Sequence, residues 1–215
     1  TEQPGFDFDK VRTAASTMWN KDLSKVQVEG GTKDEKTIFY TGMYHLLIHP
    51  NILQDVNGEY PMMESLKVGH TTGNRYTVFS LWDTYRNVST LMTLLYPERQ
   101  LDIIRTMLDM YRENGWLPKW ELYGRETFTM EGDPSIPYIV DAWMRGLRDF
   151  DEQTAYEAMR KGATTPGEFN LLRPDANDYF SKGYVPLREQ YDNSVSHALE
   201  YYIADWNLAT FAQAL

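Results

Sequence analysis

The sequence contains no cysteine. Disulfide bonds, thiolate metal sites and cysteine catalysis are therefore excluded, and the redox compartment stays open. The chain also lacks an apolar run long enough to cross a membrane and a basic-then-apolar leader at Thr1, so we expect any targeting signal to have been removed or never present. Phosphate-binding glycine loops, dinucleotide fingerprints and nucleophile elbows around Ser80 or Ser196 do not occur, which leaves nucleotide and serine-nucleophile chemistry without support.

Basic residues are in the minority. The chain has 21 Lys and Arg against 31 Asp and Glu, which gives a formal net charge of −10 and a sequence pI of about 4.9. Because like charges repel, a polyanion such as nucleic acid is disfavoured as a partner.

Histidine is scarce. The four are His45, His49, His70 and His197. His45 and His49 are four residues apart in a predicted helix, a spacing compatible with a metal, but the HExxH pattern is absent because Leu46 and Leu47 follow His45. We therefore favour packed or capping histidines over a metal site.

Aromatic residues are abundant. They make up 14% of the 215 residues, with 15 Tyr and 6 Trp, and hydrophobic residues make up 42%. A chain of this length suits one domain or part of a larger one, and it has enough apolar residues to bury a core. Proteins that bind carbohydrate often have this composition, but large helical cores have it too.

Apolar residues at helical spacing predict a succession of helices. The predicted helices cover residues 8–24, 33–49, 82–95, 97–114, 134–148 and 152–161, and a last one runs from Ser194 or Ser196 to the end. Thr32 or Asp34 is expected to cap the second helix and Asp133 the fifth. The last helix ends in Phe-Ala-Gln-Ala-Leu without a stop signal, which predicts that the chain is a piece of a longer one.

Between the helices lie a short extended piece at 25–29, a turn at Gly30-Gly31 and predicted loops at 51–74, 116–132 and 162–193. This order gives an all-α fold class with minor short strands. Paired antiparallel helices with long loops at one end predict part of an α/α toroid, and a plain helical bundle is the alternative.

The central stretch, residues 75–86, begins with strand-like alternation and then changes to helical spacing at Trp82. Asp83 falls in the first helical turn, and Arg86 lies three residues later, so the two side chains are expected to form an acid–base pair beside the Trp82 ring. A ring with a neighbouring carboxylate and guanidinium suits a sugar. The alternative is a capping Asp, an ion pair within the helix and a core Trp.

A second polar and aromatic cluster lies in the loop at 116–126, and it contains Lys119, Trp120, Arg125 and Glu126. Such residues on a loop between helices are good candidates for a binding site, although tryptophans can also simply pin a loop to the core. Glycoside hydrolysis needs two carboxylates, one of them held protonated. The candidates are Asp83, Glu126, Glu131 and Asp133, and the sequence does not pair them.

Four segments, in this order, resemble glycoside hydrolase family 92. They read FYTGMYH at 39–45 with HPN at 49–51, YTVFSLWDTYR at 76–86, GWLPKW at 115–120 and GYVP at 183–186. The resemblance runs from about Trp19 to Leu215. Members of the family are mainly bacterial, calcium-dependent, exo-acting α-mannosidases.

The resemblance implies that residues 1–215 are a partial (α/α)₆ catalytic domain, truncated at both ends, with a β-sandwich domain before it. It implies inverting, single-displacement hydrolysis of terminal α-mannosyl residues, in which Ca²⁺ holds two adjacent hydroxyls of the terminal mannose. Asp83 would contact the far hydroxyls of that sugar, and Trp82 and Arg86 would shape the pocket. The expected substrate-binding set is Trp82, Asp83, Arg86, Lys119, Trp120 and Glu126. The expected partners are an α-mannoside glycan and the rest of the same domain, in the periplasm or outside the cell.

The chain departs from the family pattern in two ways. Where the family often reads Gly-Asn-Glu-Thr, this chain reads Gly124-Arg125-Glu126-Thr127, so Arg125 replaces the Asn and any contact that the Asn makes is in doubt. The family's general-acid motif Glu-Gly-Asn-Ala-Trp and its general-base cluster beside Gly-Gln do not occur here. We therefore expect no catalytic residue in this fragment, which alone would be inactive, and we identify no calcium ligands.

Two alternatives stay open. One is another α/α-barrel exo-glycosidase, specific for glucose, which would cleave gluco-configured disaccharides without calcium. The other is a non-catalytic helical module that binds sugar without turnover.

Overall fold

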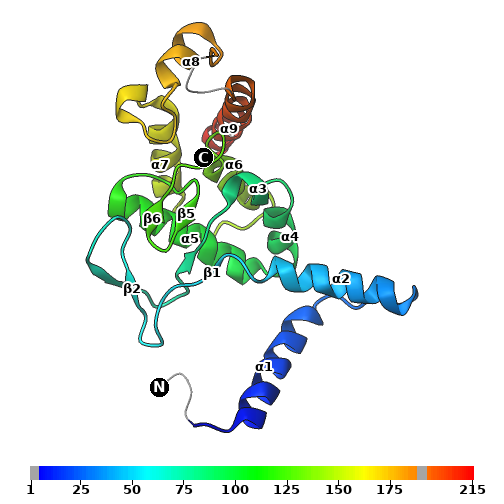
Figure 1. The fold of residues 1–215 in the computed structure, drawn as a ribbon. Helices are drawn as coiled ribbons and strands as arrows, with labels where there is room; N and C mark the ends of the chain where they lie inside the picture. The colour runs from blue at the N-terminus through cyan, green and yellow to red at the C-terminus, as the bar shows by residue number, and fades with distance from the viewer. Residues whose placement is uncertain (1–4, 188–192) are drawn as a thin grey trace. The chain divides into compact units, whose positions relative to one another are not determined.

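The computed structural model describes residues 5–187 and 193–215 (Figure 1). The chain divides into two compact units, Thr1–Asn51 and Ile52–Leu215. Each unit is described by itself below.

The first unit consists of two helices, α1 (Phe8–Leu23) and α2 (Lys33–Leu46). Asp7 caps α1 by accepting a hydrogen bond from the Lys10 amide at 3.1 Å. Thr32 caps α2, and its reciprocal bonds with Glu35 form a capping box. Both helices are therefore found where apolar spacing predicts them.

Two expectations for the first unit are wrong. The helix α2 ends at Leu46 and not at residue 49, so His45 and His49 do not share a helix face; the His49 ring instead lies 3.2 Å from the Asn51 side-chain oxygen. The short strand predicted at residues 25–29 is instead a turn followed by an irregular segment. Its Val26 carbonyl accepts a hydrogen bond from the Tyr40 hydroxyl of α2 rather than from a neighbouring strand.

The second unit is mostly helical. Its helices are α3 (Leu81–Thr84), α4 (Val88–Leu95), α5 (Pro97–Asn114), α6 (Ser135–Met144), α7 (Glu152–Thr164), the short 3₁₀ helix η1 (Gly167–Phe169), α8 (Ala176–Lys182) and α9 (Ser194–Ala214). Gly115 closes α5 with a left-handed φ of 87°, directly after the predicted end of that helix at residue 114. The helix predicted over 82–95 is interrupted at Tyr85–Asn87, which separates α3 from α4.

The core of this unit lies where α6 packs against α9, α7 and α4 (Figure 1). Nearly all of α6 is buried, and the Trp143 ring meets the Phe211 ring of α9 edge-on at 5.0 Å. The inner face of α5 adds the fully buried Ile104 and Met107. Burial of this continuous apolar surface is the main term that stabilises the helices.

Short strands occupy two of the predicted loops. Within residues 51–74, β2 (Glu59–Pro61) pairs antiparallel with β3 (Val68–His70), and β1 (Asn51–Ile52) precedes them. Within residues 116–132, β5 (Glu121–Leu122) pairs with β6 (Arg125–Glu126). The remaining short strand, β4 (Tyr76–Thr77), lies just before α3. The predicted loop at 162–193 contains η1 and α8, and its residues 188–192 lie outside the described part of the chain.

Candidate functional site

The segment that leads into α3 is held in an unusual backbone conformation. Val78 has a φ of +66°, which a β-branched residue rarely adopts. The Glu121 carboxylate on β5 accepts hydrogen bonds from the Thr77 hydroxyl at 2.9 Å and the Val78 amide at 3.0 Å. Burial raises the pKa of Glu121, and these bonds to its charged form oppose that rise. The buried carboxylate thus compensates for the strain and fixes the direction in which α3 begins.

Three of the predicted site residues lie in or just after α3: Trp82 and Asp83 in the helix and Arg86 two residues beyond its end. Asp83 lies in its first turn, as expected, and is exposed, and one of its carboxylate oxygens accepts a hydrogen bond from the Ser80 hydroxyl. Trp82 is only half-buried, so it is not a core residue. The expected ion pair between Asp83 and Arg86 does not form, because Arg86 pairs with Glu200 of α9.

Arg86 is stacked between two rings. Its guanidinium lies 5.0 Å from the centre of the Trp82 ring and 4.8 Å from that of Tyr85. Burial lowers the pKa of this guanidinium, but the hydrogen bond and the negative charge of Glu200 raise it by more. Arg86 therefore stays positively charged beside two aromatic faces.

The loop that contains Lys119, Trp120 and Glu126 is tied together by the Glu126 side chain. One oxygen accepts the Lys119 amide at 2.7 Å, and the other accepts the Trp120 and Phe128 amides at 2.8 Å. The Glu126 carboxylate is thus occupied in shaping the loop. The Trp120 indole nitrogen is buried and has no hydrogen-bond partner within the described residues.

Lys119 is buried, with 2% of its surface exposed. Burial lowers the pKa of its ammonium, while the charges of Asp133, Glu131 and Glu126 raise it. The structure therefore places Lys119 below the surface of the loop, among carboxylates.

The other two candidate carboxylates are also engaged. Glu131 pairs with His197 of α9 at 2.7 Å. The sequence position of Asp133 predicts that it caps α6, but its side chain does not cap that helix. Its carboxylate points instead to the fully buried Arg173 at 3.3 Å, and Arg173 also pairs with Asp205 of α9 at 2.7 Å. Burial raises the pKa of Asp133, and Arg173 opposes that rise.

The helix α9 connects the two predicted clusters. Through Glu200 it meets Trp82 on α3 and Arg86 just after it, and through His197 it meets Glu131, whose charge acts on Lys119. Our sequence reasoning missed Glu200 and Glu121. The available signal was an acidic residue at position 200 in the mostly apolar last helix, whose other acidic residue is Asp205, because a charge on such a helix is buried only with partners.

No group of three or more His, Asp or Glu side chains among residues 5–187 and 193–215 is placed to hold a metal ion. The donor set that Ca²⁺ prefers, several carboxylate and carbonyl oxygens around one point, is therefore not assembled from acidic side chains of this part of the chain.

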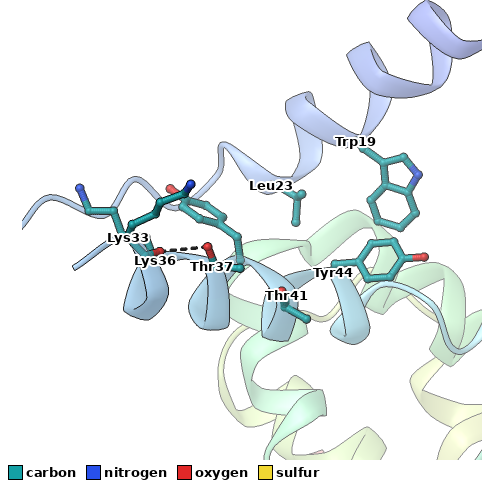
Figure 2. A pocket seen from close by; sticks show the side chains of 8 residues that line it. Trp19, Leu23, Lys33, Lys36, Thr37, Thr41 and Tyr44 are labelled. Atoms are coloured by element: carbon teal, nitrogen blue, oxygen red, sulfur yellow. Dashed lines mark hydrogen bonds between the residues drawn. The ribbon is translucent and has the colours of Figure 1, made fainter. Parts of the chain in front are cut away.

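A separate groove of about 710 Å³ lies between α1 and α2 of the first unit (Figure 2). In Figure 2, the Trp19 ring of α1 lies against the Tyr44 ring of α2, with ring centres 4.6 Å apart. The other lining residues are Leu23, Lys33, Lys36, Thr37, Tyr40 and Thr41. All of the predicted site residues belong to the second unit.

Comparisons with known proteins agree on one family. The profile of the glycosyl hydrolase family 92 catalytic domain matches residues 1–215. A family 92 α-mannosidase of Bacteroides thetaiotaomicron is 34% identical, with a TM-score of 0.89 over 99% of this chain and 28% of its own, and that enzyme has also been solved in complex with mannoimidazole.

Two further relatives extend the comparison. An inverting family 92 mannosidase of the same organism is 31% identical, with a TM-score of 0.89 over 98% of this chain and 29% of its own. A protein of Arthroderma benhamiae described as an uncharacterized secreted glycosidase is 27% identical over all of this chain and 25% of its own. The chain thus spans about a quarter of the length of these relatives, and its mostly helical fold matches the corresponding part of the solved enzymes.

Proposed function

Because this chain belongs to glycosyl hydrolase family 92, we propose that it is part of an exo-acting α-mannosidase that removes terminal α-mannosyl residues from glycans such as N-glycans or mannans. The observation that carries the proposal is the arrangement of residues 82–86, where the exposed Asp83 follows Trp82 in α3 and the Arg86 guanidinium lies over the Trp82 ring. An indole face packs on the apolar face of a sugar ring, while a carboxylate and a guanidinium bind its hydroxyls.

The site residues have different roles in this proposal. Asp83 binds two hydroxyls of the terminal mannose, since one of its oxygens keeps a single bond to Ser80 and the side chain is exposed. Trp120 offers an indole N–H that lacks a partner among the described residues. Glu126 fixes the conformation of the loop that carries Trp120, and the side chain of Lys119, on the same loop, packs inside the protein beneath it.

The acid–base pair and the calcium ion belong to the proposal too. We place the general acid, the general base and the calcium ligands in segments of the longer protein outside this chain, because Glu126, Glu131 and Asp133 are committed to contacts within it. Bound calcium would supply a positive charge that holds two sugar hydroxyls. A direct, inverting displacement by water needs the two carboxyl groups about 6.5–9.5 Å apart, which the remaining part of the domain would complete.

The relative from Arthroderma benhamiae is described as secreted, and no helix in the described part of this chain is long and apolar enough to cross a bilayer. We place the protein in the periplasm or outside the cell. Fractionation of the source cells with an antibody to this chain tests the assignment.

The experiment uses the full-length protein that contains this chain. It is incubated with α-linked mannobioses, with calcium or with a chelator, and the anomer of the released mannose is followed by NMR. We expect β-mannose, whose release the chelator abolishes. Release of α-mannose would contradict inversion, and unchanged release with the chelator would contradict the calcium requirement.

Asp83→Ala should lower kcat/KM at least about 100-fold, which corresponds to roughly 3 kcal/mol, because two charge-assisted hydrogen bonds are lost. The matched control is Asp149→Asn, which removes an exposed carboxylate whose partner is Arg105, and it should leave the rate unchanged. Near-wild-type kinetics for Asp83→Ala would refute the role of Asp83.

Two outcomes would replace the proposal. Cleavage of gluco-configured disaccharides without calcium, with mannosides untouched, would indicate a glucose-specific exo-glycosidase. Binding of mannose without turnover by the full-length protein would indicate a sugar-binding module.

A further inference from the structure

Glu200 accepts hydrogen bonds from three side chains within residues 82–86. Its carboxylate accepts the Trp82 indole N–H at 3.2 Å, the Tyr85 hydroxyl at 2.8 Å and the Arg86 guanidinium. These three donors occupy one short stretch, and the acceptor lies on α9, 114 to 118 residues later in the chain. Each oxygen of the carboxylate has at least one donor.

The environment of Glu200 makes these bonds strong. Its side chain is 9% exposed, so the charge is largely removed from water and depends on its partners. The effect appears in a neighbour, because burial and the bond to Glu200 raise the pKa of Tyr85 to about 12. Tyr85 therefore remains a hydrogen-bond donor over the whole working pH range of a protein.

The stem of Glu200 is fixed as well. A Cβ placed on Gly132 would lie 2.4 Å from the Cβ of Glu200, so the loop that follows Trp120 and Glu126 passes directly against this side chain. Gly132 has a φ of +75° and no side chain, and both properties permit the approach. Glu200 thus contacts α3 with its carboxylate and the 116–132 segment with its stem.

We propose that Glu200 is a positioning residue of the sugar pocket, which sets the orientation of the Trp82 ring and of Arg86 toward the terminal mannose. The inference rests on the proposed α-mannosidase function. Glu200 itself touches Trp82, Tyr85 and Arg86 and not the sugar. Without its charge, Arg86 loses its ion pair, and in Glu200→Gln a single amide oxygen is left to accept from Trp82, Tyr85 and Arg86, so the tilt of the indole is no longer fixed.

A second buried carboxylate provides a matched control. Glu113 on α5 also collects an arginine and a tyrosine, since it accepts Arg75 at 2.9 Å and the Tyr60 hydroxyl at 2.9 Å, and it is 6% exposed. Its partners include none of the predicted site residues. Glu113→Gln therefore removes the same kind of charge from a structural cluster, whereas Glu200→Gln removes it from the pocket.

The test compares full-length wild type, Glu200→Gln, Glu200→Asp and Glu113→Gln. For Glu200→Gln we expect kcat/KM on an α-mannobiose to fall 10- to 100-fold, and the Kd for mannoimidazole, measured by calorimetry on folded protein, to rise by a similar factor. Glu200→Asp keeps the charge and should recover part of both losses. Glu113→Gln should lower Tm while both constants stay within twofold of wild type.

A spectroscopic readout makes the result independent of activity. In protein labelled with 5-fluorotryptophan, the ¹⁹F resonance of Trp82, assigned by its absence in Trp82→Phe, should shift in Glu200→Gln and not in Glu113→Gln. Constants for Glu200→Gln within twofold of wild type, or an equal loss in Glu113→Gln, would overturn the proposal. If wild type neither cleaves α-mannosides nor binds mannoimidazole, the proposed function fails. In that case an unchanged Trp82 resonance would show that Glu200 does not orient Trp82 either, and a shifted one would support only that orientation and not a role in a sugar pocket.

Discussion

At the scale of single residues, the choice of charged partner decides what each polar group of the site can do. Asp83 and Arg86 are close in sequence, yet Arg86 pairs with Glu200, and within residues 5–187 and 193–215 the Asp83 carboxylate bonds the Ser80 hydroxyl alone. A buried carboxylate competes better for a guanidinium than an exposed one does, because water screens it less. The exposed Asp83 is thereby left available for a ligand.

Gly132→Ala is expected to destabilise the second unit by at least 1–2 kcal/mol, because its φ of +75° disfavours any side chain and the new Cβ would collide with Glu200. Chemical denaturation measures the change. Gly146→Ala is the matched control, since Gly146 also has a positive φ, of 99°, but a Cβ there meets nothing within 4 Å. Equal losses in the two variants would mean that contact with Glu200 adds nothing.

His197 makes stability depend on pH. Burial lowers its pKa, Glu131 opposes the shift and Lys119 adds to it. The unfolded chain then binds a proton more readily than the folded one, so stability falls as the pH drops below about 6.5, the ordinary value for histidine.

We therefore expect His197→Gln to lose less stability than wild type between pH 7.5 and pH 5, as measured by denaturant midpoints at each pH. The exposed His70→Gln is the control and should follow wild type. Parallel curves for wild type and His197→Gln would contradict the assignment.

At the scale of elements, the strained connection between β4 and α3 depends on Glu121. Glu121→Gln should cost about 1–3 kcal/mol, because the amide keeps one acceptor oxygen while the Thr77, Val78 and Gly124 donors all point at the side chain. Urea denaturation tests this, with exposed Glu157→Gln as a control that should stay within about 0.5 kcal/mol of wild type. A neutral Glu121→Gln would mean that the positive φ of Val78 needs no such support.

Periodicity and caps predicted the long helices of the chain well. The helices α5, α7 and α9 begin within a residue of their predicted starts. Local signals mark these boundaries: Pro97 begins α5 and Gly115 ends it, and Asp151 caps the start of α7. The hairpins at 59–70 and 121–126 were missed, since strands of two or three residues leave no period to detect.

The sequence named the candidate residues of the site, and the structure shows contacts among them that the sequence did not predict. Trp82 and Asp83 were identifiable because α3 follows a strand-like stretch, and their motif also carried the family resemblance. Glu200, the partner of Trp82 and Arg86, lies more than a hundred residues away, and no local pattern encodes such a contact. The same reason explains why Asp133 resembled a helix cap: its partner Arg173 is 40 residues distant.

At the scale of the whole molecule, much apolar surface is left uncovered. On α9, Val195, Leu199 and Trp206 form an exposed stripe, with 71%, 54% and 75% of their surfaces accessible. In the first unit, α1 buries none of the residues of its described helix, although Phe8 and Met18 are apolar. Exposed apolar surface of this kind favours association.

The isolated 215-residue chain should therefore self-associate and bind the dye ANS. Trp206→Gln should weaken association several-fold, as measured by light scattering after size exclusion. Tyr123→Gln is the control, because Tyr123 is 62% exposed but lies on the β5–β6 hairpin, away from the stripe. A monomeric chain, or equal effects of the two variants, would contradict a specific role for the stripe.

The long separation between Trp82 and Glu200 also has a consequence for synthesis. The indole emerges from the ribosome 118 residues before the carboxylate that orients it. At roughly 5–20 residues per second, translation needs about 6 to 24 s to deliver that partner. During this interval the nascent chain carries Trp82, Tyr85 and Arg86 without their shared acceptor, so this corner of the protein cannot mature until the last helix has been made.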